Sequence, residues 1–383
     1  MTRRVVILTE IISPYRIPLF NALARHEGLD LHVIFLAETD PNLRQWQVYT
    51  QEIKFSYQVL PAWRKLLSGY NALLNRGVAR ALAAVAPDVI LCGGYNYLAF
   101  WRALLWAHFR NIPFLLWSES TLQDMRRGHV LVEFMKGEFF DKCSGFVVPG
   151  RSAMEYLRAY KIREERIFTA PNAVDNDLFA AGATLARQVP DARRRELGLP
   201  DPYFLFVGRL VPEKGVFDLL SAYAKLNEAV RQKVGLVFVG DGASRRQLER
   251  QAASVAPGVI RFPGFAQRDQ LAAYYALAQA LILPTYTDTW GLVVNEAMAC
   301  SLPVILSRAA GCAADLVKQE WNGLLVQPGD VPALAVAMEM LAQQPEVCAA
   351  MGLNSRRHIS HYSPAGWSVG LARAVATIGE GRD

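Results

Sequence analysis

Short runs of β-branched and other apolar residues alternate with longer segments of helical periodicity along the whole chain. This alternation is typical of βαβ units, in which helices connect parallel strands. Six such runs lie in the first half, at residues 4–8, 31–36, 88–92, 113–117, 145–148 and 166–170. Six more lie in the second half, at residues 203–208, 234–240, 259–262, 280–284, 303–306 and 323–326. Each half therefore has enough strands for its own doubly wound parallel α/β sheet.

The length of the chain also favours two domains. It has 383 residues, 52% of them hydrophobic, and chains of this length usually divide into more than one core. We expect an N-terminal domain over residues 1–175, a linker over 176–202 and a C-terminal domain over 203–363. The linker is placed where Ala, Gly, Pro and charged residues mix without a strand pattern. The pattern of residues 364–383 predicts a final amphipathic helix.

Charge and cysteine content exclude several classes of protein. The 41 Lys and Arg against 35 Asp and Glu give a formal charge of +6, which suits anionic small molecules or an anionic lipid surface. The basic residues are too evenly spread for a nucleic-acid partner. The five cysteines include no CxxC pair and mostly lie in apolar runs, so we expect reduced core residues. No window approaches the roughly 18 apolar residues of a spanning helix, which favours a cytoplasmic protein, free or peripheral on the inner face of the membrane.

The most specific segment of the sequence is PTYTDTWGLVVNEAMACSLPVILS. Asp288 is followed after seven residues by Glu296, and Gly291 lies where the strand pattern turns helical. A helix N-terminus presents free N–H groups and a partial positive charge, so the backbone of Gly291, Leu292 and Val293 could bind a phosphate. Further along that helix, Glu296 could accept hydrogen bonds from both ribose hydroxyls. The simpler alternatives are a capping or turn role for Asp288 and a solvated helical position for Glu296.

A second segment, VGRLVPEKG, follows the first strand of the second half. Arg209 and Lys214 would project from the loop at the carboxyl end of the sheet, where open α/β sheets bind ligands. A diphosphate leaving group gains negative charge as its sugar departs, and two fixed cations would stabilise that charge.

These segments resemble family 4 retaining glycosyltransferases, which have the GT-B fold. DTWGLVV and EAMACSLPVI are similar to the E-x7-E signature of that family, and GRLVPEKG to its pyrophosphate-binding loop. The chain departs from the signature at Asp288, which replaces the usual Glu, and at Ser301, which replaces the usual Gly. The family's first acid touches the transferred sugar, so the shorter Asp288 affects the reach to that sugar. The resemblance implies two Rossmann-like domains facing each other across a cleft, with the C-terminal helix crossing back to pack on the N-terminal domain.

The resemblance adds weaker donor-binding candidates in two further loops of the C-terminal half. VGDG is by itself a generic turn from strand to helix, but in the family this loop lies by the donor, which implies Gly240, Asp241 and Gly242. FPGF occupies the loop that borders the base in the family. Its backbone near Gly264 and Phe265 would contact the nucleobase.

The N-terminal half is less diagnostic. The segment SPYRIPLFNAL stands where many family members have a Gly-rich loop, and it has no glycine, so Arg16 would supply any positive charge near Ser13. A surface-loop role for Arg16 is an equal alternative. Paired glycines in CGGYNY end another strand, and Tyr95 and Asn96 follow as acceptor-side candidates.

The segment LLWSES ends the strand where the family often has a catalytic histidine near the donor sugar. Here the chain offers Glu119 instead, and His129 ten residues further on. We expect Glu119 to take this place. Arg126 and its neighbour Arg127 would either meet a phosphate or be solvated.

Two N-terminal stretches interleave aromatic and basic residues, at 60–82 and 100–110. An amphipathic helix of this kind can lie in a lipid interface, and only the first stretch is a serious candidate for such membrane contact. The apolar residues of the second nearly encircle the helix, which favours core packing.

The resemblance predicts a hexosyltransferase-type enzyme that moves a sugar from a UDP- or GDP-linked donor to an acceptor hydroxyl with retention of configuration. We expect closure of the two domains over the donor, no cofactor and no metal ion, since the cationic loop and the helix dipole would replace a divalent ion. The acceptor would be a glycan, a lipid-linked glycan or a small molecule, in bacterial surface polysaccharide, lipopolysaccharide or glycolipid synthesis. The alternatives are a nucleotide-sugar 2-epimerase of the same fold and a non-catalytic nucleotide-sugar-binding subunit. A nicotinamide-dependent dehydrogenase is disfavoured, because neither half has GxGxxG after a strand.

Overall fold

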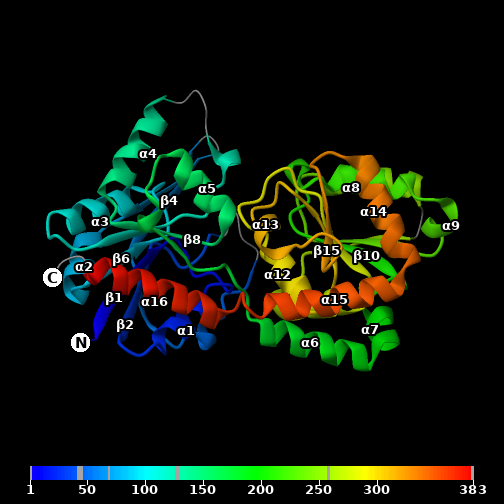
Figure 1. The fold of residues 1–383 in the computed structure, drawn as a ribbon, viewed down its shortest axis with the longest axis horizontal. Coiled ribbons are helices and arrows are strands. Elements are labelled where there is room, and N and C mark those ends of the chain that lie inside the picture. The colour runs from blue at the N-terminus through cyan, green and yellow to red at the C-terminus, as the bar shows by residue number, and fades with distance from the viewer. Residues whose placement is uncertain (1, 41–45, 68–69, 126–129, 257–258, 381–383) are drawn as a thin grey trace. The chain divides into compact units, whose positions relative to one another are not determined.

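The computed structural model describes residues 2–40, 46–67, 70–125, 130–256 and 259–380 (Figure 1). Contacts divide the chain into two compact units. The first is formed by residues 1–172 together with 364–383, and the second by residues 173–363. The first unit therefore contains both the beginning and the last segment of the chain.

In its described part, the first unit is built on a parallel sheet of seven strands in the order β3-β2-β1-β6-β7-β8-β9. These strands are β1 Arg3–Thr9, β2 Leu29–Phe35, β3 Ser56–Val59, β6 Val89–Cys92, β7 Phe114–Trp117, β8 Gly145–Val148 and β9 Ile167–Thr169. The central strands are nearly continuous apolar runs, because helices cover both faces of a parallel sheet. That continuity is the reason the sequence identifies them.

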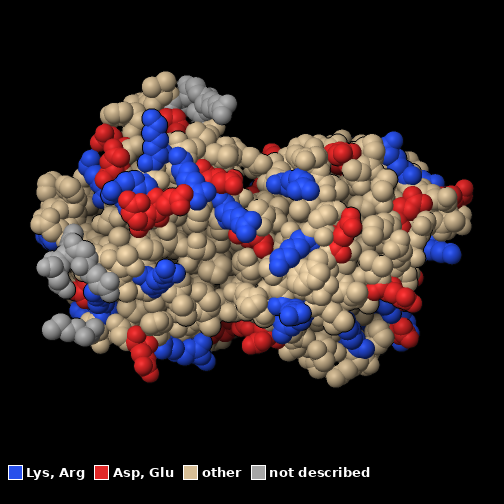
Figure 2. All heavy atoms as spheres, viewed as in Figure 1, with Lys and Arg blue, Asp and Glu red and all other residues tan. Residues whose placement is uncertain are grey.

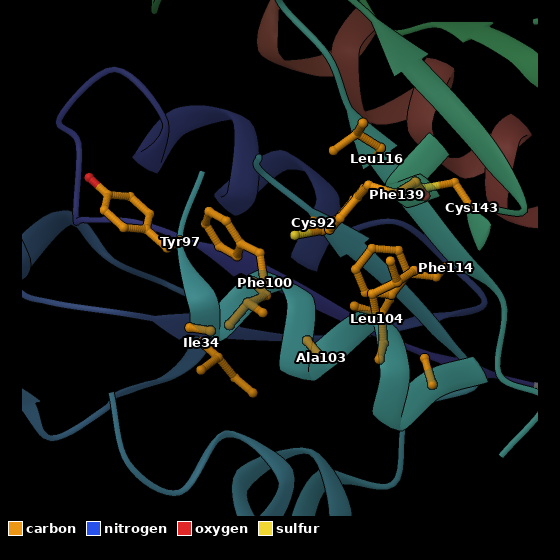
Figure 3. Close-up of a cluster of buried hydrophobic side chains, with 14 of the residues drawn as sticks. Ile34, Cys92, Tyr97, Phe100, Ala103, Leu104, Phe114, Leu116, Phe139 and Cys143 are labelled. Carbon is orange, nitrogen blue, oxygen red and sulfur yellow. The ribbon is translucent and has the colours of Figure 1, made fainter. Parts of the chain in front are cut away.

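Helices divide between the two faces of this sheet. They are α1 Ile17–Ala24, α2 Val78–Val85, α3 Leu98–His108, α4 Val130–Lys142, α5 Arg151–Ala159 and α16 Pro364–Glu380, with short 3-10 turns η1 Thr50–Glu52, η2 Leu122–Asp124 and η3 Glu164–Arg166. Successive strand residues point to opposite faces, so Val6 and Leu8 pack with α2 to α5 while Val5 and Ile7 pack with α1 and α16. Figure 3 shows the first of these cores, in which the ring of Phe114 lies against that of Phe139 and the ring of Phe100 lies beside that of Tyr97.

The last helix, α16, completes the second core of this unit. Trp367 is fully buried, and its ring lies 5.2 Å from Trp117 and 5.8 Å from Phe20, centroid to centroid. Arg3 donates a hydrogen bond of 2.8 Å to the carbonyl of Val375. These contacts confirm the expectation that the C-terminal helix packs on the N-terminal part of the chain.

The prediction of an amphipathic helix over residues 60–82 is wrong. Strands β4 Ala62–Leu67 and β5 Tyr70–Asn75 pair with each other as an antiparallel hairpin, and among the described residues of this stretch only α2 is helical. The composition favours a helix, but Leu73 and Asn75 are buried while Leu74 is exposed, a period of two that suits a strand. Asn75 donates a 2.6 Å hydrogen bond to the carbonyl of Leu36, which ties the hairpin to the end of β2. The second stretch, 100–110, is helical as expected and contributes Phe100, Leu104 and others to the core.

The second unit has a parallel sheet in the order β12-β11-β10-β13-β14-β15 within its described residues. The strands are β10 Tyr203–Val207, β11 Gly235–Val239, β12 Ile260–Gly264, β13 Ala280–Leu283, β14 Val304–Ser307 and β15 Gly323–Val326. The helices are α6 Asn176–Gln188, α7 Pro190–Leu197, α8 Val216–Lys225, α9 Glu228–Arg231, α10 Arg245–Val255, α11 Arg268–Leu277, α12 Leu292–Ala299, α13 Ala313–Leu316, α14 Val331–Gln343 and α15 Pro345–Ile359, with a 3-10 turn η4 Pro212–Lys214. Every strand expected from the sequence is present.

The segment expected to be a linker, 176–202, is mostly helical and belongs to the second unit. Asp175 caps α6 by accepting a hydrogen bond of 3.0 Å from the N–H of Leu178, and Pro190 occupies the first turn of α7. Helix α6 packs against α11, and the ring of Phe179 lies 6.2 Å from that of Tyr275. The mixture of Ala, Gly and charged residues suggested a linker, but Ala183 and Ala186 form part of the buried face of α6.

All five cysteines are buried and unpaired, as the sequence predicts. Lys and Arg side chains are interspersed with Asp and Glu over the face shown in Figure 2. Among the described residues, no helix is both long enough and apolar enough to cross a bilayer.

Candidate functional site: a cationic loop at the sheet's switch point

The strand order of the second unit reverses between β10 and β13, which are neighbours in the sheet. Open parallel sheets bind ligands at the carboxyl ends of their strands, beside such a reversal. The loop after β10 carries Arg209 and Lys214, and the loop after β13 carries Asp288 and leads to α12. The two segments singled out in the sequence therefore meet at the switch point.

Lys214 and Asp288 form the contact that joins these loops. The ammonium nitrogen of Lys214 lies 2.6 Å from Oδ2 of Asp288 and 3.2 Å from the carbonyl oxygen of Thr287. Both side chains are largely buried, which strengthens the pair relative to one on the open surface.

The backbone explains why the two loops can approach so closely. Gly215 has φ +67°, and a Cβ there would lie 2.1 Å from the carbonyl oxygen of Pro284. One strand further on, Gly240 has φ +136°, and a Cβ there would lie 1.9 Å from the carbonyl oxygen of Gly208. Side chains are thus excluded at both positions by conformation and by space.

Asp288 also has the turn role that was the simpler alternative. Its Oδ1 accepts a hydrogen bond of 3.3 Å from the N–H of Trp290, two residues further on. Helix α12 then begins after Gly291, which has φ +96° and provides no side-chain cap. The half-buried Leu292 and Val293 form its first turn, where backbone N–H groups have no acceptor within the helix.

Glu296 lies in the same helix but points into the protein. It is fully buried, and its Oε2 accepts a hydrogen bond of 2.6 Å from the hydroxyl of Tyr275 on α11. A ribose could contact this carboxylate only after a change of rotamer or of the residues that cover it. The sequence did not indicate Tyr275, because nothing in the pattern of α11 marks which of its buried residues faces α12.

The remaining donor-side candidates lie along the same edge of the sheet. Arg209 is exposed, and the N–H of its neighbour Leu210 donates to the carbonyl of Asp241 over 2.9 Å. The N–H of Gly240 donates to the carbonyl of Gly264 over 2.8 Å, so the three loops after β10, β11 and β12 are joined by backbone bonds. Gly242 follows Asp241 in the loop after β11, and Phe265, which follows β12, is exposed.

In the first unit, Arg16 and Glu119 lie together at the carboxyl edge of the sheet. The Arg16 guanidinium lies 3.6 Å from Oε2 of Glu119 and 4.1 Å from the centre of the Trp117 ring. Asn172 donates a hydrogen bond of 3.0 Å to Oε1 of Glu119. Glu119 is thus held between a cation and an amide. The sequence missed Asn172, because it is distant along the chain and belongs to no strand.

The other acceptor-side candidates are more scattered. The carbonyl of Ser13 accepts a hydrogen bond from the N–H of Arg16 over 3.0 Å, which makes it a turn residue. Asn96 is exposed, while the hydroxyl of Tyr95 lies 3.5 Å from that of Tyr156, inside the unit. Burial raises the pKa of Tyr95 above its ordinary value. Arg126, Arg127 and His129 lie outside the described residues.

Comparison with known proteins supports the class that fold and site define. Residues 190–358 match the family model described as glycosyl transferases group 1, and residues 19–178 match the one described as glycosyltransferase family 4. The chain therefore belongs to the glycosyltransferases of this GT-B type.

Two relatives and one structure illustrate the similarity. The sulfoquinovosyl transferase of Arabidopsis thaliana is 29% identical over 76% of this chain and 56% of its own length. A D-inositol 3-phosphate glycosyltransferase of Catenulispora acidiphila is 32% identical over 59% of this chain and 53% of its own. The structure of HepE of Anabaena in complex with UDP shares the fold, with a TM-score of 0.75 and 17% identity over 98% of this chain and 100% of that one. The aligned part of this chain spans about half the length of the curated relatives it matches.

Proposed function

We propose that this protein is an enzyme that transfers a sugar from a UDP- or GDP-linked donor to an acceptor hydroxyl, with retention of anomeric configuration. The observation that carries the proposal is the Lys214–Asp288 contact at the switch point, which brings a cation and a carboxylate from the two signature segments together. Relatives named for sulfoquinovosyl and D-inositol 3-phosphate transfer support sugar transfer as the reaction class. A neighbour solved with UDP supports a nucleotide-linked donor.

The diphosphate of the donor would lie between the loop after β10 and the start of α12. The Lys214 ammonium has three N–H donors, and two of them are directed at Asp288 and Thr287. The third is available to a phosphate oxygen. With the exposed Arg209 and the N–H groups at the start of α12, it would stabilise the charge that develops as the sugar leaves. Asp288 would then hold Lys214 in place and face the transferred sugar.

On the acceptor side, Glu119 would take the place of the histidine that the family often uses. Its carboxylate is fixed by Arg16 and Asn172, so it can accept a hydrogen bond from a hydroxyl without first being ordered. We further propose transfer without a metal ion, because Lys214 and Arg209 supply the charge at the diphosphate. Synthesis of a bacterial surface polysaccharide, lipopolysaccharide or glycolipid is the process proposed.

The test is to incubate the purified chain with a panel of UDP- and GDP-sugars and candidate acceptors, and to measure release of the nucleoside diphosphate. Lys214→Met should lower the rate by about 100-fold or more, whereas Lys225→Met, an exposed lysine at the end of α8, should leave it unchanged. The rate should persist in EDTA. Failure of every donor to bind or to react, or equal rates in the two variants, would overturn the proposal, and a product that is an epimerised nucleotide sugar would identify the epimerase alternative.

A further inference from the structure

Helix α4 begins with apolar side chains that the described residues of the first unit leave exposed. The exposed fractions are 80% for Val130, 72% for Leu131, 44% for Val132, 62% for Phe134 and 46% for Met135. Isolated exposed apolar residues are ordinary in soluble proteins, but a cluster of large ones in one short segment marks a binding surface. We call residues 130–135 the α4 tip.

The inward side of α4 is fixed by unusual contacts. Lys136 is only 5% exposed, and its ammonium lies 3.0 Å from Oε1 of Glu133 and 3.0 Å from the hydroxyl of Tyr160. One turn further on, Phe139 and Phe140 are buried in the core (Figure 3 shows Phe139). The tip is therefore anchored to a rigid base. The apolar residues of the tip are exposed, whereas the charged Lys136 that follows them is buried.

The arrangement around the helix axis indicates what covers the tip. Successive helical residues are about 100° apart, so Val130, Leu131 and Val132 point in three different directions, yet all three are exposed. A protein partner packs against one stripe of a helix, whereas a fluid hydrocarbon medium surrounds it on all sides. The tip is also much smaller than the roughly 20–30 residues a side of a stable protein interface.

The tip lies toward the carboxyl edge of the sheet. Helix α4 follows β7 in the chain, so its first residues lie toward the carboxyl ends of the strands, and Glu119 comes directly after β7. The exposed Leu122 of η2 lies between them in the chain. At the same edge the hairpin exposes Trp63 and Leu74, which are directly opposite in register. Apolar surface therefore borders the side of the unit where the acceptor candidates are.

We propose that the α4 tip inserts into the interfacial region of a lipid bilayer and holds the acceptor edge of the first unit against the membrane. Rigid apolar side chains would enter the boundary between headgroups and acyl chains, as interfacial helices do. The acceptor hydroxyl would then belong to a molecule anchored in that bilayer. This last step rests on the proposed function, whereas insertion itself does not.

The first experiment places a reporter on the tip of the full-length chain. Leu131→Cys can be labelled with a polarity-sensitive fluorophore, because the five native cysteines are all buried. The matched control is Leu353→Cys on α15, whose leucine is 69% exposed. Vesicles of phosphatidylcholine with phosphatidylglycerol should shift the emission of the first probe to the blue and leave the second unchanged. Equal shifts, or none at either position, would refute insertion of the tip.

The second experiment removes the apolar surface. In a flotation assay with the same vesicles, the vesicle-bound fraction of the double variant Leu131→Ser/Phe134→Ser should be at least about tenfold lower than that of the unmodified chain. The control Val336→Ser/Leu353→Ser, in the second unit, should bind the vesicles as well as the unmodified chain. Binding of UDP by calorimetry should be the same in all three, so loss of vesicle binding is distinguished from failure of the donor site. A concentration-dependent dimer in sedimentation that the tip variant abolishes would assign the surface to a second copy of the chain and overturn the proposal.

Discussion

Asp288 is one methylene shorter than the glutamate it replaces, and its carboxylate is committed to Lys214 at 2.6 Å and to the N–H of Trp290 at 3.3 Å. Both oxygens of this carboxylate are hydrogen-bonded within the protein, so Asp288 fixes the position of Lys214 and of the turn at Trp290. The two sequence segments predicted one shared site, and the structure brings Lys214 and Asp288 together, whereas the carboxylate of Glu296 points into the protein. The direct ion pair could not be predicted, because side-chain direction within a loop depends on the backbone path set by Gly215 and Gly291.

Replacing the Asp288 carboxylate by an amide should separate turnover from nucleotide binding. In Asp288→Asn the Lys214 ammonium loses its neutralising partner, so UDP should bind at least as tightly as before. Turnover should fall by roughly 10- to 100-fold, the range expected when a hydrogen bond to a charged group is lost. Calorimetry with UDP and steady-state kinetics measure the two effects, and a variant with weakened UDP binding and normal kcat would contradict this role.

The hydroxyl of Tyr275 stabilises the buried carboxylate of Glu296. Tyr275→Phe should lower the free energy of unfolding by about 1–3 kcal/mol, because the carboxylate keeps its burial and loses a donor. The neighbouring Tyr274→Phe is a matched control, since the hydrogen bond made by Tyr203 goes to the backbone of that residue. Urea denaturation of both variants measures the difference, and equal midpoints would argue against the importance of this bond.

At the scale of elements, the strands buried on both faces were predictable and the edge of the first sheet was not. Strand β3, with sequence SYQV, and the hairpin β4–β5 lack the uninterrupted apolar runs of the central strands. The hairpin is rich in Ala, Leu, Lys and Arg, which are good helix formers. Its strands form because Arg64 pairs with Asp40 after β2 and Asn75 bonds to Leu36, and such long-range contacts leave no local signal.

The pairing of β2 with β3 should make stability depend on pH. His32 on β2 bonds through Nδ1 to the hydroxyl of Ser56 on β3 at 2.8 Å, and burial lowers its pKa below the ordinary value although Asp30 opposes the shift. The unfolded chain then binds a proton more readily than the folded one, so stability declines as pH falls below about 6.5. Between about pH 8 and pH 5, the urea midpoint of the unmodified protein should fall more than that of His32→Gln. Parallel pH profiles would show that His32 contributes nothing.

At the scale of the whole molecule, two parallel sheets and a returning C-terminal helix follow from the alternating pattern and the family resemblance. The sequence did not predict that residues 176–202 are mostly helical and belong to the second unit, because an alanine-rich helix and a linker have similar composition. Glu296 and Tyr275 show the same limit within the site: the motif located the glutamate on its helix, but packing between α11 and α12 decides where its carboxylate points.

The stability of the first unit should depend on α16, whereas nucleotide binding by the second unit should not. Trp367→Ala should remove about 3–5 kcal/mol from the stability of the first unit, because a fully buried indole between Phe20 and Trp117 is lost. UDP binding should survive at temperatures where the second unit remains folded. Val369→Ala, on the exposed side of the same helix, is the control and should change stability little. A single unchanged thermal transition in Trp367→Ala would contradict this dependence.

The return of α16 to the first unit also sets an order of events during synthesis. Trp367 and its neighbours are translated after every residue of the second unit, yet they fill the core beneath β1, β7 and β8. Domains usually mature from the N-terminus as the nascent chain leaves the ribosome. Here the second unit has all of its residues first, and one face of the sheet in the first unit is covered only in part, by α1, until α16 has been translated.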